Sequence, residues 1–130
     1  MRRYLLDTNV VVWLLLGDRT AVPQDVADTL ADPTSTALVS AASVWETAIK
    51  RSLGKIRIED SWLRTLLSLD LDQLTITAEH AAAVQTLPWH HRDPFDRLLV
   101  AQAQVEDCVL VTADRQLDEY GVDTWWGDAG

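Results

Sequence analysis

Short apolar stretches alternate along the chain with longer segments in which apolar residues recur at helical spacing. The apolar stretches are flanked by polar or turn-forming residues and predict strands at 4–7, 36–39, 74–76, 109–112 and 122–125. The segments with helical spacing predict helices at 10–16, 23–32, from 40 to about 54, 60–69, 77–87, 93–105 and 114–120. The segment 88–92 between the fifth and sixth helices is predicted to be a loop.

This alternation of strand and helix predicts an α/β fold with a mainly parallel sheet, because parallel strands are joined by crossover helices and buried on both faces. The 130 residues contain no linker, repeat or low-complexity segment, and we expect one domain covering 1–130. Sites in such folds form outside the carboxyl ends of the strands. The residues that follow each predicted strand are therefore the first candidates for function.

Composition narrows the possible functions. Hydrophobic residues make up 48% of the chain, which excludes disorder, while the formal net charge of −9 argues against a broad basic face for nucleic acid. Phosphate chemistry would need a divalent cation or locally clustered basic residues, and the acidity favours a basic protein partner. The single cysteine, Cys108, excludes an intrachain disulfide and a thiolate metal site. The apolar run 10–16 is too short to span a membrane, so we expect a cytoplasmic protein.

Acidic residues follow two predicted strands and lie near the start of two helices. Asp7 ends the first strand, Asp114 follows the strand at 109–112, Asp96 lies in the first turn of the helix that begins at Asp93, and Glu46 lies about two turns into its helix. Each has helix capping as an alternative role, because helix starts favour acidic residues. Their shared position at one edge of the sheet is what indicates a common site.

Clustered carboxylates repel one another unless a cation neutralises them. Ligands that are all oxygen favour hard ions, so the expected cofactor is Mg²⁺ or Mn²⁺. Such ions activate water and stabilise the charge of a phosphodiester under in-line attack. The adjacent His90 and His91 cannot easily share one ion, and surface or substrate-contact roles are predicted for them.

Four segments resemble the PIN-domain ribonucleases and, more narrowly, the VapC toxins of bacterial toxin–antitoxin pairs. They are Leu5-Leu6-Asp7-Thr8-Asn9, Val44-Trp45-Glu46, the stretch 93–103 that begins Asp93-Pro94-Phe95-Asp96-Arg97, and Leu110-Val111-Thr112-Ala113-Asp114. Together they extend over nearly the whole chain.

The resemblance implies a three-layer α/β/α sandwich and a Mg²⁺- or Mn²⁺-dependent endoribonuclease that cleaves RNA. It also implies a homodimer inhibited by a small cognate antitoxin. The family's catalytic acids correspond here to Asp7, Glu46, Asp96 and Asp114. Supporting polar groups correspond to Asn9 and Thr112, and Asp93 is assigned to helix capping, with metal contact as the alternative.

The resulting hypothesis is that Asp7, Asp96 and Asp114 hold a metal ion directly or through water. Glu46 would complete that site, help to hold a second ion or orient the attacking water. Basic residues around the acidic rim are candidate contacts to the RNA backbone, with solvated surface or ion pairing as the alternative: Arg92, Arg97, Lys50, Arg51 and Lys55.

Three other functions remain open on the sequence alone. A phosphatase of the haloacid-dehalogenase type would have a second aspartate two residues after Asp7, where this chain has Asn9. A phospho-acceptor receiver domain would have adjacent acids after the first strand and a lysine after a late one, where Thr8 and Ala113 stand. A protein-binding domain would use the acids only as helix caps and would bind no Mn²⁺.

Overall fold

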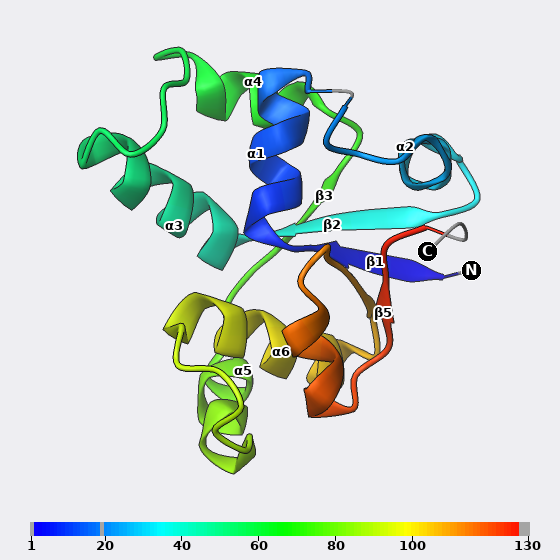
Figure 1. The fold of residues 1–130 in the computed structure, drawn as a ribbon, viewed down its shortest axis with the longest axis vertical. Helices are drawn as coiled ribbons and strands as arrows, with labels where there is room; N and C mark the ends of the chain where they lie inside the picture. The colour runs from blue at the N-terminus through cyan, green and yellow to red at the C-terminus, as the bar shows by residue number, and fades with distance from the viewer. Residues whose placement is uncertain (1, 19, 128–130) are drawn as a thin grey trace.

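The computed structural model describes residues 2–18 and 20–127, in which parallel strands form one sheet with β1 at its centre (Figure 1). In the order β3-β2-β1-β4-β5, the strands are Asp72–Leu74, Thr36–Ser40, Arg3–Leu6, Val109–Val111 and Thr124–Trp125. The central β1 pairs with both β2 and β4. Because all strands run the same way, the carboxyl ends of these three lie side by side at one edge.

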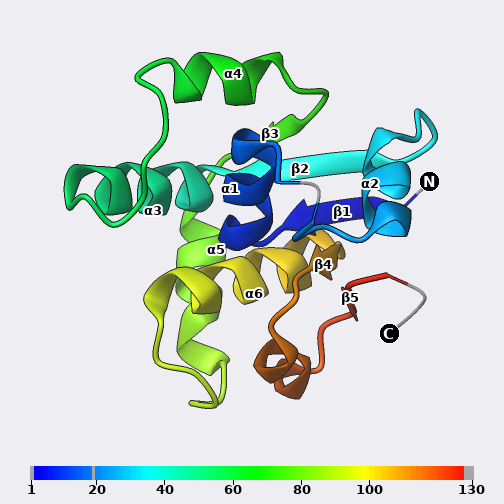
Figure 2. The same ribbon diagram turned by 45° about the horizontal axis from the view of Figure 1, so that its top comes forward.

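Helices cover both faces of the sheet (Figure 2). One face carries α1 (Thr8–Leu16), α2 (Gln24–Ala31) and α4 (Trp62–Ser68). The other carries α5 (Ala78–Ala83), the 3₁₀ helix η1 (Val84–Thr86), α6 (Pro94–Glu106) and the 3₁₀ helix η2 (Arg115–Tyr120). The remaining helix, α3 (Ala41–Ser52), extends from the carboxyl end of β2 and contacts both α1 and α6.

Neighbouring residues of β1 and of β2 point into opposite cores. Leu5 packs with α6 on one face, and Leu6 packs with α1 on the other. Leu38 and Val39 of β2 divide in the same way. A strand buried on both faces needs apolar residues at every position, which accounts for the continuous apolar stretches in the sequence. The predicted three-layer α/β/α sandwich is confirmed.

Several predicted boundaries are wrong. The strand expected at 122–125 is β5, which begins at Thr124, and the helix expected at 60–69 is α4, which begins at Trp62. The strand expected at 74–76 is β3, two residues earlier, and the helix expected at 10–16 begins at Thr8. The helix expected at 77–87 is α5 followed by η1. The edge strand β3 exposes Asp72 and Gln73, so burial left no apolar pattern there to mark its start. Within the described residues, no helix is long and apolar enough to cross a membrane.

Candidate metal centre

Asp7 leaves the end of β1 and occupies the position that precedes the first residue of α1. Its side chain makes no capping hydrogen bond to that helix. Instead, the Thr112 hydroxyl donates to Asp7 Oδ2 at 2.7 Å, in a buried environment. Burial raises the pKa of Asp7, and this hydrogen bond opposes the increase. The backbone amides of Thr8 and Asn9 also lower this pKa, and the hydrogen bond to Thr112 gives the carboxylate a contact beyond the start of α1.

Thr112 connects two of the predicted acids. Its hydroxyl oxygen also accepts a hydrogen bond of 3.0 Å from the backbone amide of Asp114, so one side chain fixes the carboxylate of Asp7 and the backbone of Asp114. Asp114 Oδ1 caps η2 by accepting from the amide of Gln116 at 2.9 Å. This cap uses one carboxylate oxygen and leaves Oδ2 to face the site. Capping and site roles are thus compatible at Asp114.

Glu46 is buried in the second turn of α3. This position was predicted from the expected start of the helix at Ser40. Ser40 is the N-cap and accepts from the amide of Ala42 at 3.0 Å, which excludes a capping box formed by Ser43 and Glu46. The Glu46 side chain is only 8% exposed, and its Oε2 lies 2.9 Å from Lys50 Nζ. Among the described residues, its buried Oε1 has no hydrogen-bond partner.

Asp96 reaches the same region from the first turn of α6. The capping role belongs to Asp93, which accepts from the backbone amides of two first-turn residues at 2.8 and 3.3 Å. Burial, followed by the charges of Asp7, Asp93, Glu46 and Asp114, raises the pKa of Asp96 to about 7. The charges of these acids therefore act on Asp96, while the described residues whose ligand atoms lie within 4.8 Å of one another are Asp96, Asp114 and His91.

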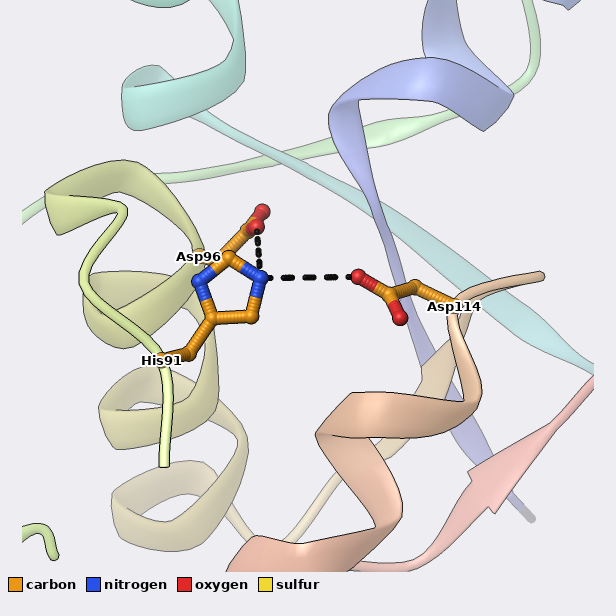
Figure 3. Close-up of side chains that lie close together, drawn as sticks. All are labelled: His91, Asp96 and Asp114. Carbon is orange, nitrogen blue, oxygen red and sulfur yellow. Dashed lines mark ion pairs between the residues drawn. The ribbon is translucent and has the colours of Figure 1, made fainter. Parts of the chain in front are cut away.

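His91 also lies beside these acids, whereas the sequence predicted a surface or substrate-contact role for it without placing it among them. Its Nε2 lies 3.4 Å from Asp96 Oδ2 and 3.6 Å from Asp114 Oδ2, between the two carboxylates (Figure 3). The neighbouring His90 lies against η2 instead, with Nδ1 3.5 Å from Glu119 Oε2 and its ring at an edge angle to Tyr120. In the sequence, the one feature that indicated a position near the acids was the short distance along the chain from His91 to Asp93.

The prediction that Arg97 contacts the RNA backbone is wrong, because the structure buries its side chain. Its side chain is buried, with a residue exposure of 2%, and Nη1 donates to the Pro88 carbonyl at 2.8 Å. Nη2 donates to the carbonyls of Val84 and Leu87 at 3.2 and 3.3 Å. The guanidinium also lies 3.8 Å from the centre of the Trp89 ring. Arg97 therefore holds the loop before α6 together.

The remaining predicted contacts lie at the surface or in ion pairs. Arg92 and Lys55 are exposed, and Arg51 is paired with Asp60. Asn9 is exposed in the first turn of α1. Lys50 is part of the Glu46 ion pair and is half-exposed. The RNA contacts predicted for these basic residues and the supporting role predicted for Asn9 stay predictions.

Comparisons with solved structures show proteins of the same fold. Similar solved structures include DNA-bound VapBC from Salmonella typhimurium, with 17% identity and a TM-score of 0.74 over 98% of this chain and 100% of that chain. VapBC2 from Rickettsia felis, bound to a promoter DNA fragment, has 18% identity and a TM-score of 0.73 over 95% and 97% of the two chains. FitAcB from Neisseria gonorrhoeae has 21% identity and a TM-score of 0.62 over 94% and 96%.

Identities this low support the fold alone. No curated protein matches the chain. The family model of the PIN domain, however, matches residues 4–123, which is most of the chain. The chain therefore belongs to the PIN domain family.

Proposed function

We propose that this protein is a divalent-metal-dependent endoribonuclease. The observation that carries the proposal is the buried Oε1 of Glu46, which has no hydrogen-bond partner among the described residues, in a carboxylate whose charge helps to raise the pKa of Asp96. A buried carboxylate oxygen without a partner is costly unless the site binds something positive. Membership of a family of nucleases supports phosphodiester cleavage as the use of that positive charge.

The acids fit a hard cation. Asp7, Asp96 and Asp114 would hold Mg²⁺ or Mn²⁺, and Glu46 would contribute its Oε1, which has no hydrogen-bond partner among the described residues. When bound, such an ion activates water and stabilises the charge that develops on a phosphodiester under in-line attack. The raised pKa of Asp96, caused by burial and by neighbouring negative charges, is also the shift that a cation would reverse.

The surrounding residues keep the carboxylates in place. The Thr112 hydroxyl fixes Asp7, and Lys50 binds one oxygen of Glu46 while leaving the other free for the site. Asp93 caps α6 and so fixes the turn that carries Asp96. These hydrogen bonds and this ion pair keep the acids oriented before substrate binds.

We also propose that the protein is the toxin of a toxin–antitoxin pair, acting in the cytoplasm as a homodimer neutralised by a cognate antitoxin. Two of the similar structures are named as VapBC complexes, and a Klebsiella pneumoniae structure is named as a toxin–antitoxin complex. The net charge of −9 suits a basic partner. The hydrolytic activity and the pairing are separate parts of the proposal, because either can hold without the other.

RNA cleavage that depends on added metal is the direct test of the activity. Incubated with total RNA and Mn²⁺ or Mg²⁺, the protein should produce internal fragments, and excess EDTA should stop the reaction until metal is restored. A 5′-labelled oligonucleotide analysed on a sequencing gel separates internal cuts from stepwise removal of terminal nucleotides. Cleavage that survives EDTA, or release of mononucleotides only, would contradict the proposal.

The pH dependence of stability tests whether the acids bind metal. The raised pKa of Asp96 means that the folded state holds the proton more tightly than the unfolded state. Its contribution to metal-free stability is therefore greatest below pH 3.8 and is lost as the pH rises to about 7. Mn²⁺ needs the deprotonated acids, so it should raise the Tm more at about pH 8 than at about pH 6. Equal Tm increases at both pH values would argue that this carboxylate does not take part in binding.

A further inference from the structure

The His91 side chain points its Nε2 into the candidate metal centre. The atom lies between Asp96 and Asp114, at 3.4 and 3.6 Å from their Oδ2 atoms, and the side chain is largely buried (Figure 3). These three residues present atoms that all lie within 4.8 Å of one another, close enough to share one ion. His91 can thus be either a metal ligand or a hydrogen-bond donor, and the two roles need different tautomers of the ring.

The other ring nitrogen decides between these roles. The backbone amide of Asp93 donates to His91 Nδ1 at 3.2 Å, so the lone pair of Nδ1 is already used. A neutral ring with an unprotonated Nδ1 carries its proton on Nε2, and a protonated nitrogen cannot bind a metal. The ring therefore presents an N–H group to the centre.

Among the described residues, the nearest acceptors to this N–H group are the Asp96 and Asp114 carboxylates, which lie at ion-pair rather than hydrogen-bond distance. Distances of 3.4 and 3.6 Å to the carboxylates exceed the 2.7–3.2 Å range of N–H···O hydrogen bonds, and within the described residues no hydrogen bond is formed at Nε2. An oxygen of an anion that enters the centre would provide the missing acceptor. A phosphodiester drawn to a cation held by Asp96 and Asp114 supplies such oxygens.

Arg97 and Tyr120 hold the loop that carries His91 through its backbone carbonyl groups. The His91 carbonyl oxygen accepts long, weak hydrogen bonds from Arg97 Nη1 at 3.5 Å and from the Tyr120 hydroxyl at 3.4 Å. The same Arg97 side chain binds the Pro88 carbonyl at 2.8 Å. A donor held in place before the substrate binds stabilises a transition state more than a mobile one does, because nothing must reorganise during the reaction.

We propose that His91 is a catalytic residue whose Nε2–H donates a hydrogen bond to a non-bridging oxygen of the scissile phosphodiester. The inference deepens the proposed ribonuclease function and rests on it. His91 keeps its proton throughout, and its contribution is stabilisation of the negative charge that develops on the phosphate.

Kinetics of three variants test the role in the reaction. With saturating Mn²⁺, H91A should lower kcat by about 100- to 1000-fold, the range for loss of one such donor. H91Q keeps an N–H donor and should recover part of that loss. H90A is the matched control, since His90 lies against η2, and its kcat should stay within about threefold of wild type. An H91A enzyme with wild-type kcat would overturn the proposal.

Two measurements without catalysis separate the donor from a ligand. In ¹H–¹⁵N spectra of the metal-free protein, His91 should show the tautomer with Nε2 protonated, and this proton should remain after Mg²⁺ is added and shift when inorganic phosphate follows. The Kd for Mn²⁺ should change by less than about threefold in H91A, because loss of a ligand or of its support costs about 10- to 100-fold. Loss of the Nε2 proton on adding Mg²⁺, or nitrogen coupling in the Mn²⁺ EPR spectrum, would identify His91 as a ligand and refute the proposal. If wild type fails to cut RNA, the ribonuclease proposal is wrong, while the tautomer and its response to phosphate still test the donor itself.

Discussion

Replacing Asp7 with asparagine is expected to reduce metal-dependent RNA cleavage by at least about 100-fold while leaving the fold intact. Asparagine has the shape of aspartate and an oxygen that can still accept the 2.7 Å hydrogen bond from Thr112. It lacks the charge that would hold the cation. Initial rates on a labelled RNA, measured with Mn²⁺ for D7N and wild type, check the result.

The same substitution should not destabilise the metal-free protein. Burial raises the pKa of Asp7, with the negative charge of Glu46 as a smaller cause, so the charged form is unfavourable where it lies. D7N removes that charge and should have a metal-free Tm at neutral pH equal to or above that of wild type. It should also gain less Tm from Mn²⁺.

An exposed acid away from the centre provides the control. Asp70 lies on the surface between α4 and β3, and D70N should cleave RNA and bind Mn²⁺ like wild type. If a folded D7N preparation cleaves at the wild-type rate, the assignment of this centre is wrong. If both variants lose activity together, net charge rather than the centre is responsible.

The strand-end acids were predictable because the position of the site follows from the topology. Once the apolar stretches indicate parallel strands, the residues after β1 and β4 must share one edge, and these residues include Asp7 and Asp114. The depth of Glu46 in its helix followed from Ser40 as the helix start, which the structure confirms. Local sequence was sufficient here because each position is set by the element that carries it.

Arg97 and His91 were not predictable in the same way, since their roles depend on where a loop lies. An arginine in the first turns of a helix beside acids resembles a surface residue in sequence. Here the loop before α6 turns its carbonyl groups toward Arg97 and buries it. The loop also directs His91 into the centre while its neighbour His90 packs outside. Neither arrangement has a sequence period that could reveal it.

Replacing Arg97 with alanine should lower the free energy of unfolding by about 3 kcal/mol or more, because each buried acceptor left unpaired costs about 1–3 kcal/mol. The guanidinium binds the carbonyls of Val84, Leu87 and Pro88 and lies 3.8 Å from the centre of the Trp89 ring. R97K should recover little, since a lysine ammonium cannot reproduce the planar fork of donors. Urea unfolding followed by circular dichroism measures the change, and R92A, at an exposed position, should stay within about 0.5 kcal/mol of wild type. A stable R97A protein with weakened RNA affinity would instead restore the RNA-contact role that the structure argues against.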